Sequence, residues 1–244
     1  MPQHNKNKLS KKPTYPPRRV EEILGQHEDD TSPWRIFKIM TEFVSGFDFL
    51  KRYDTAVSIF GSARFNPKSH DYKEAEKLAN RLAKAGFAVI TGGGPGVMEA
   101  ANRGAYLAHG KSIGFNIQLP QEQRINKYVT DSQSFYYFFV RKVMLAFASE
   151  IYIFFPGGFG TIDEFSEIVT LVQTKKINPV PIILIGKDFW QPFLNWIEET
   201  VYQKYHAIDR EDMKIYHIVD SSEEAWVLVQ SLMKKHKLQR GDIH

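Results

Sequence analysis

Short apolar runs alternate with helical patterns along most of this chain, and several of the runs end in glycine or small polar residues. Six runs are predicted as strands: Ala56–Phe60, Ala88–Ile90, Ser112–Ile117, Ile151–Phe155, Val180–Ile185 and Ile215–Val219. The helices predicted between and after them are Tyr72–Lys84, Val97–His109, Phe135–Ser149, Ile162–Gln173, Trp190–Tyr202 and Glu223–Lys234. Uninterrupted apolar strands alternating with helices indicate an α/β fold, a parallel sheet with helices on both faces.

The glycines gather where such a sheet binds ligands, beyond the carboxyl ends of its strands. Gly61-Ser62, Gly92–Gly96, Asn116 and Gly157–Thr161 each follow or end a predicted strand. We therefore expect a ligand site at this edge, with Ser62 among its residues.

The 244 residues suffice for one domain, which we place at residues 31–235. It begins with a helix that Ser32 caps and that carries an apolar stripe from Ile36 to Leu50. Residues 1–30 read as a disordered basic tail, and residues 236–244 as a second tail. No cysteine is present, which excludes disulfides, thiolate zinc sites and a cysteine nucleophile.

Charge and hydropathy limit the expected partners. The net charge of +4 comes largely from the two ends, and no nucleic-acid-binding motif accompanies it. The first ~25 residues lack the apolar core of a secretory signal, and no apolar run approaches the ~20 residues of a membrane helix. We expect a soluble cytoplasmic protein that binds neither nucleic acid nor membrane.

The segment Pro156-Gly157-Gly158-Phe159-Gly160-Thr161 joins a strand to a helix. This geometry presents free backbone N–H groups to an anion, so Gly157, Gly158, Gly160 and Thr161 are candidate phosphate ligands. Glu164 follows within the first helical turn. The alternative is a capping box in which Thr161 caps the helix and Glu164 only reaches back to it.

The glycines of Gly92–Gly96 fit neither common nucleotide fingerprint. In the dinucleotide motif GxGxxG, the third glycine is replaced by Val97 if the motif starts at Gly92, and by Glu99 if it starts at Gly94. Gly110-Lys111-Ser112 resembles the end of a P-loop, but it leads from a helix into a strand, which is the reverse of the P-loop order. Both NAD and P-loop ATP sites are thereby disfavoured. Gly93 and Gly94 remain candidates for close approach to a ligand, against the alternative of a tight turn.

The predicted helix Phe135–Ser149 is apolar on nearly every side, and Arg141 and Lys142 are the charges in its middle. Such a helix is usually buried, so we expect part of it to meet another subunit in a homodimer or higher homo-oligomer. Arg141 either snorkels or forms a structural ion pair, or it faces the anion site of the Pro156 loop.

Together, Gly92–Glu99, Arg141-Lys142 and Pro156-Gly157-Gly158-x-Gly160-Thr161-x-x-Glu164 resemble the LOG (Lonely Guy) family, whose members are often mislabelled as lysine decarboxylases. The resemblance spans roughly residues 56–219. It implies a Rossmann-like doubly wound sheet and an enzyme that hydrolyses the N-glycosidic bond of a nucleoside 5′-monophosphate. The products would be a free base and ribose 5-phosphate, and no cofactor or metal would be needed.

The resemblance also implies roles for single residues. Arg141 and Glu164 fall on the essential arginine and glutamate, and Lys142, Glu122 and Thr170 fall on further substrate-binding positions. The plant pattern Met-His before Arg-Lys is missing, because Phe138-Phe139-Val140 precedes Arg141. This departure leaves the base open, with AMP and a cytokinin riboside monophosphate as candidates.

Glycosidic cleavage passes through an oxocarbenium-like state, which a carboxylate near the anomeric carbon stabilises. We expect Glu164 to supply it, ionised near pH 7 with help from Arg141. Two other classes stay open: a non-catalytic nucleotide-binding module, and a pyridoxal-dependent decarboxylase, for which no lysine has a recognisable context.

Overall fold

The computed structural model describes residues 33–117 and 125–241, with side chains as far as residue 234. The first half of the described elements is α2 (Pro33–Leu50), β1 (Ala56–Phe60), α3 (His70–Lys84), β2 (Ala88–Thr91), α4 (Val97–Leu107), β3 (Ser112–Ile117), β4 (Asp131–Phe135) and α5 (Phe138–Ala146). The second half is β5 (Ile151–Phe154), α6 (Phe159–Gln173), β6 (Ile182–Ile185), α7 (Lys187–Trp196), a π-helix (Ile197–Lys204), a 3₁₀ helix (Arg210–Lys214), β7 (Tyr216–Val219) and α8 (Ser222–Gly241).

The seven strands that the structure describes form one parallel sheet in the order β4-β3-β2-β1-β5-β6-β7. The central strand β1 pairs with β2 on one side and with β5 on the other, in the register Ser58↔Ile90 and Ser58↔Tyr152. The chain therefore builds outward from β1 in both directions. This confirms the predicted α/β fold with a doubly wound parallel sheet.

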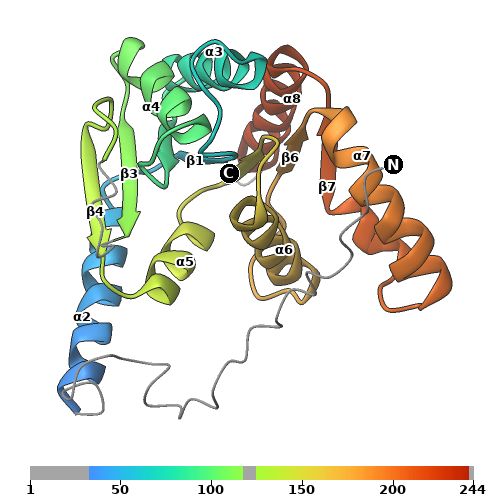
Figure 1. Ribbon diagram of the computed structural model, residues 1–244, viewed down its shortest axis with the longest axis horizontal. Coiled ribbons are helices and arrows are strands. Elements are labelled where there is room, and N and C mark those ends of the chain that lie inside the picture. The colour runs from blue at the N-terminus through green and yellow to red at the C-terminus, as the bar shows by residue number, and fades with distance from the viewer. Residues whose placement is uncertain (1–32, 118–124, 242–244) are drawn as a thin grey trace, which may run out of the picture. The chain divides into compact units, whose positions relative to one another are not determined.

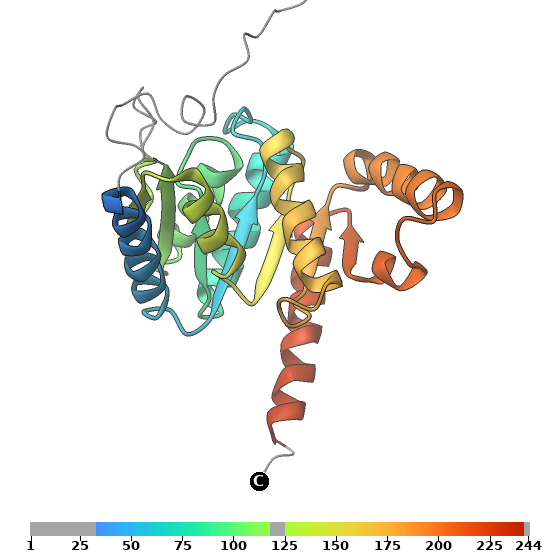
Figure 2. The same ribbon diagram turned by 90° about the horizontal axis from the view of Figure 1, so that it is seen from below.

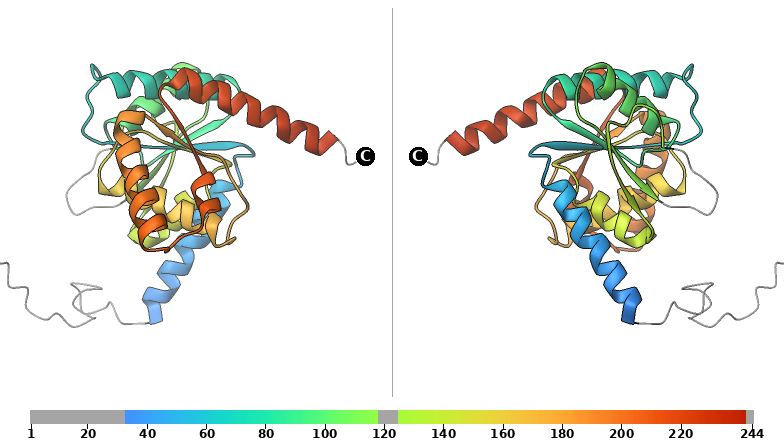
Figure 3. Two further views of the ribbon diagram at one scale, coloured as in Figure 1. Left: turned by 90° about the vertical axis from the view of Figure 1, so that its right-hand side faces the viewer. Right: turned by 90° about the vertical axis from the view of Figure 1, so that its left-hand side faces the viewer.

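Helices cover both faces of the sheet (Figures 1 and 3). On one face α3, α4 and α8 pack over buried aliphatic side chains of the central strands, among them Val57, Ile59, Val89 and Ile153. On the other face α5, α6 and α7 cover a core in which Phe154 contacts Phe165 of α6 edge to face, at a ring distance of 5.7 Å. The burial of strands on both faces explains why their sequences are apolar without alternation.

The chain divides into two units, residues 1–41 and 42–244, and the sheet lies wholly in the second. Within that unit, Glu42 accepts hydrogen bonds from the backbone N–H groups of Tyr136 and Tyr137 at 2.7 and 3.1 Å. A carboxylate at this point satisfies N–H groups immediately before α5, where helices favour negative charge.

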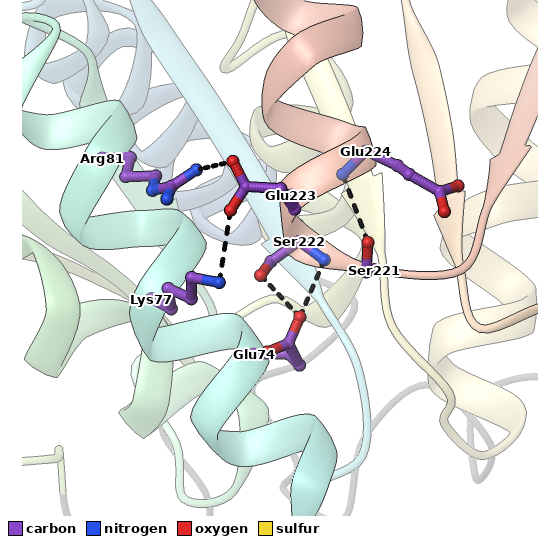
Figure 4. Close-up of polar contacts among 7 residues, drawn as sticks. All are labelled: Glu74, Lys77, Arg81, Ser221, Ser222, Glu223 and Glu224. Carbon is purple, nitrogen blue, oxygen red and sulfur yellow. Dashed lines mark hydrogen bonds and ion pairs between the residues drawn. The ribbon is translucent and has the colours of Figure 1, made fainter.

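A polar cluster fastens the start of α8 to α3 (Figure 4). Ser222 donates its backbone N–H and its hydroxyl to Glu74, at 2.9 and 2.5 Å. Lys77 and Arg81, also on α3, pair with Glu223 at 3.3 and 2.7 Å. Figure 2 shows the later part of α8 running on past the sheet.

Some elements differ from the sequence-based expectation. The strand β4 was not predicted, and the helix expected over Phe135–Ser149 is only α5, because Phe135 belongs to β4 and Tyr137 is extended. The helix expected over Trp190–Tyr202 begins earlier, at Lys187, and continues as a π-helix after Trp196. Within the described ranges, no helix is both long and apolar enough to span a membrane.

Candidate functional site

A cavity of about 910 Å³ opens at the carboxyl ends of β1 and β5. These adjacent strands lead into chain segments that run to opposite sides of the sheet, the position where doubly wound sheets bind ligands. The residues that line this cavity include the loop after β1, Gly92 after β2, side chains of α5, the loop between β5 and α6, and the first turns of α6. The Ser62 backbone holds the first loops together: its N–H donates to the Pro156 carbonyl, and its carbonyl accepts from Val97 N–H, both at 3.0 Å.

The amino end of α6 forms one wall of the cavity. Gly157, Gly158, Gly160 and Thr161 all line it, and α6 begins directly after Gly158. The first N–H groups of a helix have no acceptor within the helix and carry its positive dipole end. A β-carbon at Gly157 would overlap the Thr161 side chain, so glycine is required for this turn.

The capping box, one of the two alternatives that the sequence left open, is absent. The helix begins at Phe159, and the residue before it is Gly158, which has no side chain to cap the helix. Thr161 therefore lies inside the first turn instead of before it. Glu164 is therefore one turn further into the helix than the capping box needs. Its carboxylate is free for another use.

Glu164 lies at the cavity wall with only 6% of its surface exposed. Its Oε2 atom is buried and has no hydrogen-bond partner among the residues the structure describes. Burial raises the pKa of Glu164 to about 7, although Lys142 and Arg141 oppose the rise. Burial is thus the largest of the effects on this carboxyl group, and the help toward ionisation that we expect from Arg141 acts against it.

Arg141, on α5, lines the same cavity as Glu164. Its Nε donates to the Phe115 carbonyl at 2.8 Å, which fixes the guanidinium against the end of β3. Burial lowers the pKa of Arg141, and the charge of Glu164 acts in the opposite direction. A β-carbon at Gly92 would overlap Arg141 Nη2, so the absence of a side chain there makes room for the guanidinium.

Lys142 points elsewhere. It lies on a neighbouring groove with Asp163, Ser166, Glu167, Thr170 and Leu171. Its Nζ lies 2.5 Å from Asp163, 3.0 Å from Glu167 and 3.6 Å from Glu164. A structural ion pair was one alternative for Arg141 in the sequence analysis, but in the structure it is Lys142 that forms such ion pairs.

The remaining sequence-predicted residues are dispersed. Gly93 and Gly94 lie just behind Gly92, and both of their carbonyls accept from Asn126 Nδ2 at 3.1 Å. Thr170 lies one helical turn beyond Ser166, whose carbonyl it binds at 2.7 Å, in the groove of Lys142. Glu122 lies outside the described residues. Ligand contact by these residues stays a prediction.

Arg64, Phe159 and Phe189 are among the lining side chains of the cavity that sequence reasoning missed. Phe159, the first residue of α6, is 92% exposed, and Arg64 is exposed on the loop after β1. The sequence did contain a signal for Arg64, because this basic residue directly follows Gly61-Ser62 and Ala63, at the carboxyl end of a predicted strand. The lining thus combines two guanidinium groups, a helix amino end and one buried carboxyl group.

A protein-family model described as possible lysine decarboxylase matches residues 98–229, more than half of the chain. The chain belongs to this family, the LOG family.

Curated relatives of this LOG-family chain are distant. A probable cytokinin riboside 5′-monophosphate phosphoribohydrolase from Oryza sativa subsp. japonica is 27% identical over 153 residues, 61% of each chain. A pyrimidine/purine nucleotide 5′-monophosphate nucleosidase from Escherichia coli is 25% identical over 195 residues, 72% of this chain and 41% of the relative. The LOG-family chain thus spans about three fifths of the first relative and two fifths of the second.

Solved structures agree on the fold of this LOG-family chain. A molybdenum cofactor binding protein from Rippkaea orientalis matches with a TM-score of 0.55 at 24% identity, covering 73% of this chain and 96% of that one. The molybdenum cofactor carrier protein of Chlamydomonas reinhardtii matches with a TM-score of 0.53 at 19% identity, covering 74% and 98%. At these identities the likeness concerns the fold alone.

Proposed function

We propose that this LOG-family protein hydrolyses the N-glycosidic bond of a nucleoside 5′-monophosphate, releasing a free base and ribose 5-phosphate. The observation that carries the proposal is Glu164: a buried carboxyl group, with one oxygen unpartnered among the described residues, beside the glycine-rich amino end of α6. A buried carboxyl group without a partner is costly, and such groups concentrate at functional sites.

The names of the relatives support this reaction class. The rice protein is named a phosphoribohydrolase of a nucleoside 5′-monophosphate, and the E. coli protein a nucleotide 5′-monophosphate nucleosidase. Both names describe cleavage between base and ribose phosphate. The breadth of bases differs between them, so the reaction class is better supported than any particular base.

In the proposed complex the 5′-phosphate binds at the amino end of α6, where Gly157, Gly158, Gly160 and Thr161 lie. Arg64, for which the described residues supply no ion pair, then reaches the phosphate from the loop after β1. A nucleotide phosphate carries about two negative charges at neutral pH, and a guanidinium matches its geometry. Arg64 would thus bind the phosphate, whereas Arg141 is already held by its hydrogen bond to the Phe115 carbonyl.

The chemistry falls to Glu164 and Arg141. Ionised Glu164 accepts a proton from water as the water oxygen bonds to the anomeric carbon, and its charge stabilises the oxocarbenium-like state. The C–N bond breaks, its electron pair moves to the base nitrogen, and a proton from the protein or solvent neutralises the base. Arg141 stabilises the negative charge that develops on the leaving base.

The base is the open part of the substrate. Phe159 and Phe189 offer apolar ring faces in the cavity lining, on which any base can stack. The test is chromatography of the products from AMP, CMP, GMP, UMP and isopentenyl-AMP incubated with the purified protein. We expect free base and ribose 5-phosphate from at least one of them, and the ranking then decides between AMP and cytokinin nucleotides.

A non-catalytic nucleotide-binding module is the second candidate, because two structural neighbours are named for binding or carrying a cofactor. It predicts saturable binding of a nucleotide without release of base. Calorimetric binding of AMP together with no product in the panel would therefore favour this candidate over the hydrolase.

The proposal includes self-association and a cytoplasmic location. Phe47 of α2 and Phe147 after α5 contact each other and are 42% and 49% exposed, and Phe138 and Phe139 are 55% and 47% exposed. So many exposed rings on neighbouring elements are typical of an interface. Sedimentation velocity should give a mass of at least two chains, and cell fractionation checks the location.

A further inference from the structure

Lys142 lies at the centre of three carboxylates on α6. Its Nζ is 2.5 Å from Asp163, 3.0 Å from Glu167 and 3.6 Å from Glu164. The Lys142 side chain is 18% exposed, and the three acidic side chains are 55%, 27% and 7% exposed in the same order. One ammonium group thus links α5 to α6 through close contacts with Asp163 and Glu167 and a longer one with Glu164, the most buried of the three.

The two sides of Glu164 differ. Glu164 lines the 910 Å³ cavity, whereas Lys142 lies in the adjacent groove of about 370 Å³ with Asp163 and Glu167. Lys142 Nζ thus lies 3.6 Å from Glu164 Oε1 while its side chain lines the groove and not the larger cavity. A lysine so placed can act on Glu164 without touching the substrate.

We propose that Lys142 is a positioning residue: it holds Glu164 in place and favours its ionised form, and it does not bind the substrate phosphate. The proposal rests on the proposed function, in which ionised Glu164 performs the chemistry. It assigns Lys142 a task different from the substrate contact that the family resemblance implies.

The charges around Glu164 explain why Lys142 matters. Lys142 and Arg141 face it from α5, and Asp163 and Glu167 lie beside it on α6. Burial raises the pKa of Glu164 most, the two carboxylates raise it further, and the two cations oppose this rise. Removing Lys142 would leave three neighbouring carboxylates with Arg141 as the remaining cation, and like charges favour protonation of the most buried one.

The first test is the pH profile of Lys142→Met, which removes the charge and keeps a chain of similar length. We expect the acid limb of kcat/KM to move up by about one pH unit, with kcat/KM at pH 7 reduced roughly fivefold. The KM for the nucleotide at high pH should change less than about threefold. Lys142→Arg should restore most of the profile, and Lys176→Met, which removes an exposed lysine outside both cavities, should leave it unchanged.

Glu167→Gln supplies a test of opposite sign, and it does not depend on Lys142→Met folding. Loss of this neighbouring negative charge should move the acid limb down. If Lys142 binds the phosphate instead, Lys142→Met will raise KM at least tenfold and leave the limb where it is; that result overturns the proposal.

A readout without turnover separates this inference from the proposed function. Carbon-13 NMR of labelled glutamate, with Glu164 assigned through Glu164→Gln, follows the carboxyl titration in wild type and in Lys142→Met. We expect a higher midpoint in the variant, and an unchanged midpoint overturns the inference. If wild type releases no base at all, the proposed function fails while this titration still decides the role of Lys142.

Discussion

Among single residues, Glu164 should have the largest effect on how activity depends on pH. Its pKa of about 7 in the folded protein lies above the usual value of a glutamic acid because the carboxyl group is buried. If the ionised form is needed, kcat/KM should rise through an acid limb near pH 7 and level off above it. A profile that is flat from pH 5 to pH 8 would contradict this role.

The same shift has a consequence for stability. A carboxyl group whose pKa is higher in the folded than in the unfolded state binds more protons when folded, so stability falls as pH rises between the two values. Replacing Glu164 by Gln should remove up to about 3 kcal/mol of this pH dependence between pH 4.5 and pH 7. Chemical denaturation of both proteins at several pH values measures it.

Gly92 is the residue that leaves space for Arg141. The β-carbon of Gly92→Ala would overlap Arg141 Nη2 and lie 2.8 Å from Met98 Sδ. Because both neighbours are ends of flexible side chains, we expect the guanidinium to move and the fold to persist. The predicted outcome is a loss of at least about tenfold in kcat/KM with little change in melting temperature.

A double-mutant cycle isolates this effect. In an Arg141→Ala background the Gly92→Ala change should have almost no further effect, because the guanidinium that it displaces is already gone. Equal losses in both backgrounds would mean that Gly92 acts on the site by another route.

At the scale of elements, the junction of α3 and α8 makes a stability prediction. Burial opposes ionisation of Glu74, but the two hydrogen bonds from Ser222, together with the charges of Lys77 and His70, hold the pKa of Glu74 below its usual value. Such a group stabilises the fold above its unfolded pKa, and this contribution is lost as pH falls through its folded pKa. Ser222→Ala should therefore cost about 1 kcal/mol at pH 7 and less near pH 3.

Urea denaturation at the two pH values checks the prediction. Ser69→Ala is a matched control, since the Ser69 hydroxyl binds an exposed backbone carbonyl, that of Asn66. A loss for Ser222→Ala that is the same at both pH values would show that Glu74 is not involved.

The elements that sequence could predict are those buried on both sides. The central strands carry uninterrupted apolar residues, so their positions were correct within a residue or two. The strand β4 reads Asp-Ser-Gln-Ser-Phe and lies at the edge of the sheet, where one side needs no partner, so no apolar run marks it. The aromatic residues that follow β4 then extended the predicted helix too far toward the amino end.

The start of α6 shows a different limit. Thr161 and Glu164 have the spacing of a capping box, yet the glycines let the helix begin at Phe159. Local spacing cannot decide between these two starts, because the outcome depends on Glu164 being buried against α5. The contacts of Lys142 likewise depend on how α5 packs on α6, which no single segment encodes.

For the whole molecule, topology explains why residues far apart in the chain meet in one cavity. Gly61, Gly92, Arg141 and Glu164 follow or lie between different strands, and the parallel sheet brings those strand ends to one edge. This gathering was predictable from the alternation of strands and helices. The side chains that turn toward the cavity, Arg64 and Phe159 among them, were not.

The most direct test of the central claim compares Glu164→Gln with the wild-type protein on the best nucleotide of the panel. If Glu164 performs the chemistry, kcat should fall at least about a hundredfold, while the calorimetric Kd for the nucleotide changes only a few-fold. If Glu164→Gln kept wild-type kcat with its fold intact, the account would be contradicted.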